Sequence, residues 1–393
     1  MREIYLDSAA TTKIDKSVLE AMEPYFTKNF GNASSIHGQG RIALMAIEES
    51  REVIAKKLGA KPEEIYFTSG GTESNNWAIK GFAFANKNKG RHIITSAIEH
   101  DCVLNSCKWL EKQGFRVTYL PVDKYGLVYP EDLEKAIQKD TILVSVMHAN
   151  NEVGTIEPIE ELAKICHDNN IYFHTDACQS FTKVPLDVEK QKLDLVTINA
   201  HKIYGPKGVG ALYIRKGIKI EPWLHGGGHE KGFRSGTENV PGIVGFAKAT
   251  EVTTALDIEQ MENLRAILIK GSLEIPNSFL NGHPKLRLCN NANISFRFIE
   301  GESLVLRLDA KGIEASTGSA CSSHSLEPSH VLLAMGLSPI DAHSSLRLTL
   351  GRNTTRDEID YTLEVLNHEV ENLRKISPFG DKSPFGGKGG KYV

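Results

Sequence analysis

Long apolar runs, paired cysteine spacings and a large net charge are all missing from this sequence of 393 residues. No stretch approaches the length of a membrane-spanning helix, and the opening run Met1–Asp7 lacks the hydrophobic core of a signal peptide. The net charge of −3 gives no electrostatic reason to expect a nucleic acid or an acidic membrane surface as a partner. We therefore expect a cytoplasmic protein that binds neither.

The chain also has few cysteines for its length. Six cysteines do not make a disulfide framework, and no Cys-x-x-Cys occurs, which argues against a structural zinc or a four-cysteine cluster. We expect Cys166 and Cys289 to be reduced core thiols. Cys321 differs, because small polar residues surround it throughout 315–328. This setting is typical of a catalytic or redox thiol in an exposed, mobile loop, although a serine-rich loop that merely contains a cysteine has the same composition.

Helix and strand signals alternate from about residue 18 to residue 217. Short β-rich runs joined by helical patterns predict an α/β fold, with a mostly parallel sheet covered on both faces. The predicted strands are 63–68, 91–96, 116–121, 141–148, 171–176, 193–198 and 210–215. The predicted helices include 72–86, 103–113 and 158–169, the last with a proline in its first turn. The sequence thus predicts a large domain built on a seven-stranded sheet.

Pattern and composition divide the chain into three parts. We expect a large domain over 15–255, a smaller α+β domain over 256–375 that the opening residues 1–14 rejoin, and a flexible tail over 376–393. A long amphipathic helix around 258–273 is predicted to lead out of the large domain. The tail repeats Ser-Pro-Phe-Gly and then becomes rich in glycine, and such sequence cannot bury enough surface to fold alone. It is either a disordered extension or a docking segment anchored by Phe379 and Phe385.

Lys202 lies in the run Asn199–Gly208, directly after an apolar predicted strand and before a Gly-Pro turn. A lysine amine at such a strand end can form a Schiff base with an aldehyde cofactor, for which pyridoxal phosphate is the usual candidate. The run alone is not decisive, because most lysines are solvated surface charges. Other segments strengthen the interpretation.

Two segments offer partners for the charged groups of such a cofactor. Thr68–Asn76 indicates a strand end, a glycine turn and a helix start, where free amides and the Thr72 hydroxyl suit a phosphate, although such turns are common. Asp176 ends a buried predicted strand, where an unpaired carboxylate would be costly and a pyridinium nitrogen would be a fitting partner. The alternative for Asp176 is a helix N-cap.

His100 and Asn151 follow two further predicted strands. His100 could stack on a cofactor ring or transfer protons near neutral pH. A single histidine is more often structural, and the chain has 14. Asn151, in the pair Asn150-Asn151, would be an ordinary loop residue in isolation.

Together these segments resemble cysteine desulfurases of the IscS/NifS type, which belong to the class V aminotransferase family and have the fold-type I architecture of pyridoxal-phosphate enzymes. The resemblance runs from Tyr5–Thr12 to Ser344–Arg352 and covers nearly everything except the tail. Its most specific stretches are 69–76, 201–208, 234–239 and 318–323. The long loop around Cys321 is similar to the group that includes IscS and NifS, and differs from the short-loop group of SufS and selenocysteine lyases.

The resemblance implies a role for each candidate residue. Lys202 would form the Schiff base and later move protons, with Asp176 at the pyridine nitrogen and His100 over the ring. Arg347 would grip the substrate carboxylate, a bidentate task that suits a guanidinium. The remaining implied contacts are Gly71, Thr72, Asn199 and His201 at the phosphate, Gln179 at the ring hydroxyl, Asn151 at cofactor and substrate, and Thr237 reaching the phosphate from the second subunit of a homodimer.

The implied reaction converts L-cysteine to L-alanine, with the sulfur captured as a persulfide on Cys321. A scaffold protein of the IscU/NifU type would take that sulfur for iron–sulfur cluster assembly, with tRNA-thiolation enzymes as further acceptors, and Cys321 could transiently ligate a [2Fe-2S] cluster shared with the scaffold.

Two alternatives stay open. Another pyridoxal-phosphate enzyme of the same fold, an aminotransferase or a β-lyase, would not need Cys321. A non-catalytic scaffold that binds iron–sulfur partners would need neither Lys202 nor the cofactor.

Two positions depart from the family pattern. Asn199 stands where a phosphate-binding serine is usual, and because its amide can still donate a hydrogen bond, we expect binding with altered geometry. His229 stands where a glutamine is common. His225 and His229 are four residues apart, but the three intervening glycines argue against a helix that would align them on a metal.

Overall fold

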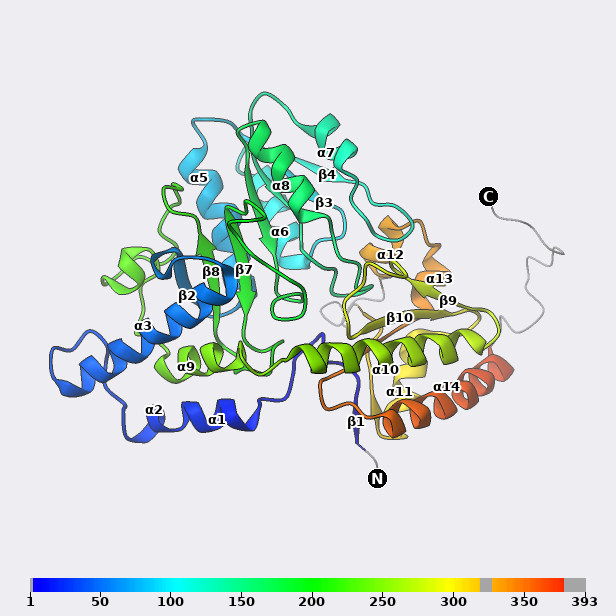
Figure 1. Ribbon diagram of the computed structural model, residues 1–393. Coiled ribbons are helices and arrows are strands. Elements are labelled where there is room, and N and C mark those ends of the chain that lie inside the picture. Colours follow the sequence, from blue (N-terminus) through cyan, green and yellow to red (C-terminus); the bar gives the residue numbers. More distant parts are fainter. Residues whose placement is uncertain (1–2, 319–326, 378–393) are drawn as a thin grey trace.

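A computed structural model describes residues 3–318 and 327–377. Its largest element is a seven-stranded sheet with the strand order β2-β8-β7-β6-β5-β3-β4 (Figure 1). The strand β8 runs antiparallel to both of its neighbours, β2 and β7, and the other pairs of the sheet are parallel. The strands are β2 (Ile65–Thr68), β3 (His92–Ser96), β4 (Arg116–Leu120), β5 (Thr141–Ser145), β6 (Tyr172–Asp176), β7 (Leu195–Asn199) and β8 (Gly210–Ile214). The predicted α/β fold, with its mostly parallel sheet of seven strands, is confirmed.

Helices cover both faces of this sheet, which explains why its strands are apolar along their whole length. In β7, Val196 and Ile198 point into one core and Leu195 points into the other, as the two-residue period of a strand requires. The first core contains residues of α1 (Lys16–Met22), α3 (Gly38–Leu58), α7 (Pro130–Ala136), α8 (Ile159–Asp168) and α9 (Val240–Ala249). The second contains residues of η2 (Trp77–Gly81), α5 (Phe82–Asn86) and α6 (Asp101–Glu111).

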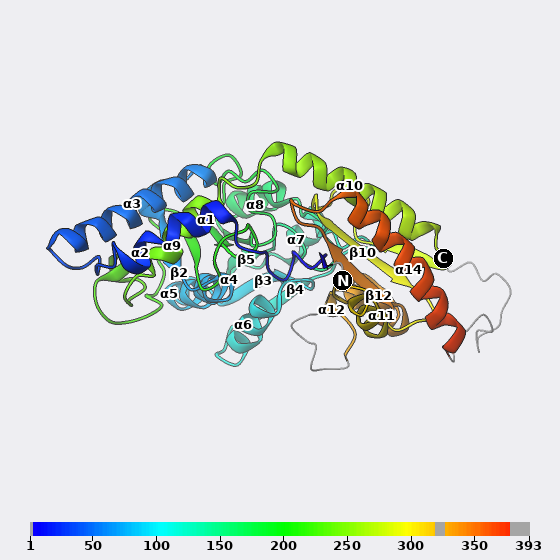
Figure 2. The same cartoon turned by 90° about the horizontal axis from the view of Figure 1, so that it is seen from below.

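A three-stranded antiparallel sheet with the order β12-β10-β9 lies beside this unit (Figure 1). Ala292, Ile294, Leu346 and Leu348 face the core shared with three helices, so the alternate residues of β10 and β12 face the opposite way. Arg347 is one of these. The elements are α10 (Ala255–Glu274), β9 (Ser278–Asn281), β10 (Asn291–Phe296), α11 (Gly301–Asp309), β11 (Ile313–Glu314), α12 (His330–Ala334), α13 (Pro339–His343), β12 (Ser345–Thr349) and α14 (Arg356–Ile376). Figure 2 shows α10 and α14 crossing this small sheet together.

The opening residues lie against this second unit. β1 (Ile4–Tyr5) pairs in parallel with β11, and Asp7 bridges to Thr349 at the end of β12. The domain boundaries placed at 14/15 and 255/256 stay a prediction. Of the tail predicted from 376, Ile376 ends α14, and Phe379 and Phe385 lie outside the described residues.

Two helices differ in detail from the sequence pattern. The helix predicted over 72–86 is a continuous run of α4 (Gly71–Asn76), η2 and α5, in which η2 is a π turn. The helix predicted over 103–113 begins two residues earlier, because the His100 ring accepts a hydrogen bond from the amide of Cys102 and so caps the helix at Asp101. In the described part of the chain, no helix combines the length and the apolar character needed to cross a membrane.

Candidate active site

A cavity of about 470 Å³ lies between the C-terminal ends of β6 and β7 and the strand β12. Most of the residues predicted from the sequence line it: Gly71, Thr72, His100, Asn151, Asp176, Gln179, Asn199, His201, Lys202 and Arg347. Thr237 is exposed and is not part of this lining. Cys321 lies outside the described residues.

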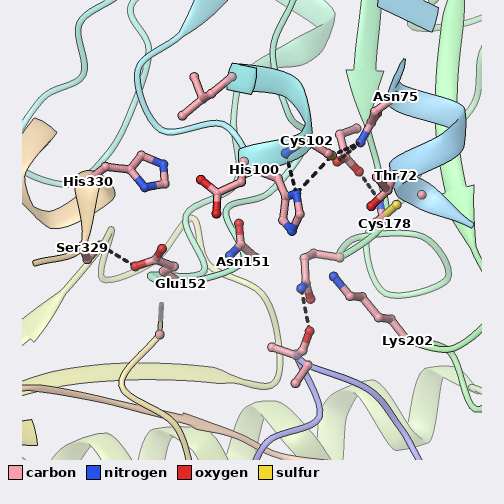
Figure 3. Close-up of a pocket in the computed structure, with 18 of the residues that line it drawn as sticks. Thr72, Asn75, His100, Cys102, Asn151, Glu152, Cys178, Lys202, Ser329 and His330 are labelled. Atoms are coloured by element: carbon pink, nitrogen blue, oxygen red, sulfur yellow. Dashed lines mark hydrogen bonds between the residues drawn. The ribbon is translucent and has the colours of Figure 1, made fainter. Parts of the chain in front are cut away.

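Lys202 follows β7 on a turn that the N-terminal segment holds in place. The amide and hydroxyl of Thr12 donate to the carbonyl of His201 at 2.8 and 2.9 Å, and Thr12 Oγ1 accepts from the amide of Tyr204 at 2.7 Å. Lys183 Nζ donates to the carbonyl oxygen of Lys202 at 3.2 Å. These contacts fix the backbone of the turn, and the amine of Lys202 extends into the cavity (Figure 3).

Asp176 ends β6 and is only 6% exposed. Its Oδ2 accepts from Asn75 Nδ2 at 2.6 Å, and its Oδ1 accepts from the amide of Cys178 at 2.9 Å. The second contact resembles the N-cap that the sequence left open, but it caps a turn rather than a helix. Neither oxygen has a lysine or arginine at ion-pair distance among the described residues. A nearly buried carboxylate with two neutral donors can still accept a cationic N–H from a ligand.

His100 lines the same cavity as Asp176. Its Nδ1 is 3.1 Å from the amide nitrogen of Cys102 and 3.0 Å from Cys102 Sγ. Burial lowers the pKa of His100, and the positive charge of Lys202 lowers it further, while Asp176 and Asp101 act in the opposite direction. The ring is therefore neutral near pH 7.

Gly71, Thr72, Asn199 and His201 form the end of the cavity next to the start of α4. A Cβ on Gly71 would lie 2.6 Å from Cys178 Sγ, so any other residue there would force a shift of the neighbouring atoms. Asn199 directs its Nδ2 at the same point, 3.3 Å from that Cβ position, and its buried Oδ1 has no partner among the described residues. Burial, and then Lys202, lower the pKa of His201 to about 4, so this ring is a neutral donor or acceptor.

Arg347 forms the opposite end. It is 2% exposed, and its guanidinium pairs with Asp7 (Nη2 to Oδ1, 2.8 Å). Its Nη1 donates to the carbonyls of Asn151 at 3.0 Å and Gly318 at 3.2 Å. Its buried Nε has no partner in the described part of the chain. The guanidinium is thus held rigidly, with a donor left for a carboxylate ligand.

The cavity contains polar groups that sequence reasoning missed. Asn75 and Cys102 lie near the signals that were recognised, because Asn75 follows Thr72 by one helical turn and Cys102 follows His100 by two residues. Glu152 is buried, and burial raises the pKa of its carboxyl group. Ser329 Oγ donates to Glu152 Oε2 (Figure 3). Nothing in the local sequence signals that Glu152 and Ser329 meet, because they are 177 positions apart.

These residues fit pyridoxal phosphate. The cavity is of the size that holds small ligands. It presents an amine at Lys202, a carboxylate without a cationic partner at Asp176, and a glycine cradle beside the unpartnered Asn199. These three features match the aldehyde, the ring nitrogen and the phosphate of the cofactor in turn.

Known proteins resemble the chain over nearly its whole length. The family model described as aminotransferase class-V matches residues 4–362. A protein named cysteine desulfurase IscS from Methanosarcina thermophila is 58% identical over 385 residues, which cover 97% of this chain and 95% of the relative. A solved structure named NifS-like protein superposes with a TM-score of 0.90 at 42% identity, covering 95% of this chain and 100% of the other. A structure titled SspA in complex with cysteine reaches a TM-score of 0.81 at 41% identity, covering 90% and 100%.

Proposed function

Because the chain belongs to the class V aminotransferase family, and within it to the cysteine desulfurases, we propose that it converts L-cysteine to L-alanine with pyridoxal phosphate as cofactor. The observation that carries the proposal is that Lys202, Asp176 and Arg347 line one cavity. They are the amine, the ring-nitrogen partner and the carboxylate receptor that this chemistry needs.

Each group has one task in the proposal. Bound pyridoxal phosphate would supply an electron sink for the carbon skeleton of the substrate. Lys202 holds the cofactor and then carries a proton on Nζ, and Asp176 keeps the ring nitrogen protonated. Arg347 would orient the substrate carboxylate, while Asp7 at its Nη2 keeps the guanidinium in place.

The phosphate would be held by the amides and hydroxyl at Gly71 and Thr72, with Asn199 and His201. Asn199 Nδ2 replaces the hydroxyl of the usual serine as donor. Gln179 would contact the ring hydroxyl, and its Nε2 already donates to the carbonyl of Ala9 at 2.9 Å, which fixes its orientation. Asn151 would contact cofactor and substrate, and His100 would cover the ring.

Cys321 collects the sulfur. As its thiolate attacks the substrate sulfur, an S–S bond forms and the C–S bond of cysteine breaks. The electron pair of that bond stays with the carbon skeleton, which gains a proton and leaves as alanine. The products, alanine and a Cys321 persulfide, together contain every atom of cysteine and the thiol. An iron–sulfur scaffold protein of the IscU/NifU type is the proposed acceptor in the cytoplasm, and Cys321 would transiently ligate a [2Fe-2S] cluster there.

Replacing the acceptor thiol tests this assignment against an aminotransferase or a β-lyase of the same fold. Cys321→Ser should keep the yellow colour of the bound cofactor but release no sulfide from L-cysteine under reductant. The matched control is Cys166→Ala, which removes a core thiol outside the cavity and should leave sulfide release intact. Persistent turnover in Cys321→Ser would remove Cys321 from the mechanism. A non-catalytic scaffold would need neither Lys202 nor the cofactor. Loss of the yellow colour in Lys202→Ala would therefore exclude it.

A homodimer in which Thr237 completes the partner's phosphate site is the second part of the proposal. Its support is that Thr237 is exposed and lies outside the cavity of its own chain. Thr237→Ala and Lys202→Ala should each be impaired as homodimers. A hybrid dimer has one chain of each variant. Its chain with Thr237→Ala keeps Lys202 and receives an intact Thr237 from its partner, so one of the two sites should regain activity. Hybrids without recovered activity would contradict the sharing of Thr237.

A further inference from the structure

Four polar side chains that line the cavity form a continuous hydrogen-bonded chain, and Figure 3 labels three of them, Asn75, Cys102 and His100. Asn75 Nδ2 is 2.6 Å from Asp176 Oδ2 and 3.2 Å from Cys102 Sγ. Cys102 Sγ is in turn 3.0 Å from His100 Nδ1, and the amide nitrogen of Cys102 is 3.1 Å from the same ring atom. The chain therefore joins Asp176, which is assigned to the cofactor's ring nitrogen, to His100, which is assigned to the ring's face.

The chemistry of the members fixes the direction of each hydrogen bond. The Asp176 carboxylate only accepts, so the Asn75 amide group donates one hydrogen to it and the other to the sulfur. Burial raises the pKa of the Cys102 thiol to about 12, with Asp176 as the next cause, so the sulfur keeps its proton. That S–H, like the backbone N–H of Cys102, is then available to His100 Nδ1, which accepts.

A ring nitrogen that accepts carries no proton. In neutral His100 the proton must then be on Nε2, the nitrogen that Figure 3 shows directed into the cavity on the side of Lys202. His100 consequently presents an N–H donor to the substrate side. To become cationic, the ring would have to protonate Nδ1 against two groups that already donate to it.

We propose that Cys102 is a positioning residue for His100: its thiol holds the ring neutral with the proton on Nε2, and Asn75 couples that setting to Asp176. This inference rests on the proposed function for the roles of His100 and Asp176. Cys102 then acts through its hydrogen bond to the ring, and is more than a small thiol that fills the core.

Three variants at position 102 separate the hydrogen bond from packing. Cys102→Ala and Cys102→Val both remove the donor, alanine with a smaller and valine with a larger side chain than cysteine. Cys102→Ser keeps an O–H that can donate to Nδ1. The pKa of His100 should rise by about half to one pH unit in the alanine and valine variants, because the neutral ring loses one hydrogen bond, and should stay close to the wild-type value in the serine variant.

Nitrogen-15 shifts of labelled histidines in the full-length, cofactor-loaded protein give both the tautomer and the pKa, with His100→Gln identifying the signal. Among the described residues, Lys202, Asp176, Asp101 and His330 also act on the pKa of this ring, and all are retained in every variant. The acidic limb of the kcat/KM profile for L-cysteine should move to higher pH by the same amount as the NMR pKa. Absorbance of the bound cofactor and the thermal unfolding midpoint check that each variant is folded and loaded.

The inference is overturned if wild-type His100 carries its neutral proton on Nδ1, or if the serine variant shifts the pKa as much as alanine and valine do. It is also overturned if none of the three moves it. These outcomes differ from a failure of the proposed function. In that case wild-type protein would release no sulfide from L-cysteine, while the tautomer and the pKa shift would still be observed.

Discussion

Glu99 is a buried acid whose protonation should set the pH dependence of stability. It is 0% exposed, and its Oε1 accepts from Ser96 Oγ at 2.7 Å and from the amide of Met147 at 2.8 Å. Its Oε2 has no partner among the described residues. Burial raises the pKa of Glu99 from 4.5 to about 8, against the opposing effect of its two donors. The folded protein therefore keeps this proton over a range in which the unfolded chain has released it.

The sign of the effect follows from this difference. The stability that the protonated group supports is fully present below about pH 4.5 and is lost as the pH rises through about 8. The difference between the two pKa values, 4.5 and about 8, corresponds to a loss of stability of about 5 kcal/mol at most, at about 1.4 kcal/mol per pH unit. Glu99→Gln retains an oxygen for both donors and has no proton to release. As the pH rises from about 5 to about 9, the free energy of unfolding of the wild type should therefore fall by about 3 to 4 kcal/mol relative to that of the variant.

Urea unfolding of wild type and Glu99→Gln at each pH measures the difference, with fluorescence and circular dichroism required to give coincident transitions. Glu161→Gln, an exposed glutamate on α8, is the matched control and should follow the wild type at every pH. A difference between wild type and Glu99→Gln that stays constant over the whole range would show that Glu99 is ionised in the folded protein, and the reasoning would fail.

Two further substitutions test packing and charge. Gly71→Ala should weaken the binding of pyridoxal phosphate by roughly tenfold through overpacking, because its Cβ would meet Cys178 Sγ, and adding Cys178→Ala should restore most of the affinity. Spectroscopic titration of the apo protein measures both, and an equally weak double variant would refute the steric cause. Arg51→Met should lower the free energy of unfolding by about 3 to 5 kcal/mol, because it leaves the buried Glu230 carboxylate without its guanidinium at 2.8 Å. Chemical denaturation measures the loss. Adding Glu230→Gln to Arg51→Met should reduce it, because the unpaired charge is removed, and an equal loss in the double variant would show that packing rather than charge is the cause.

The sequence predicted what local pattern controls. Each strand of the large sheet is an apolar run. Asp176 at the end of β6 and Lys202 just after β7 could be placed in one cavity because parallel strands end at one edge. The π turn of η2 was not predicted, since it inserts within a run that keeps a helical pattern. The contact of Asn75 with Asp176 was missed because it joins residues 101 positions apart. Only the folded chain brings those two side chains together.

The same limit applies to the electrostatics of the site. The sequence indicates that Cys321 has polar neighbours and that Cys166 has apolar ones, and Cys166 is fully buried in the structure. For Cys102 the neighbours in sequence are uninformative, because the groups that act on its thiol, Asn75 and Asp176, come from other elements. A pKa is set by what surrounds a group in space, so it cannot be derived from a pattern of adjacent letters.

The pairing of the opening strand with β11 and β12 has a consequence for the order of events during synthesis. Ala9 donates its amide to Thr349 Oγ1 across 340 positions of chain, and Asp7 pairs with Arg347 over the same separation. On the ribosome the opening strand must wait, unpaired, until almost all the other described residues have been made. Closing so long a loop is slow, and an exposed strand edge invites association in the interval. The end of the cavity formed by Arg347 is therefore assembled last, so a nascent chain that already holds Lys202 does not yet have the carboxylate receptor that we propose.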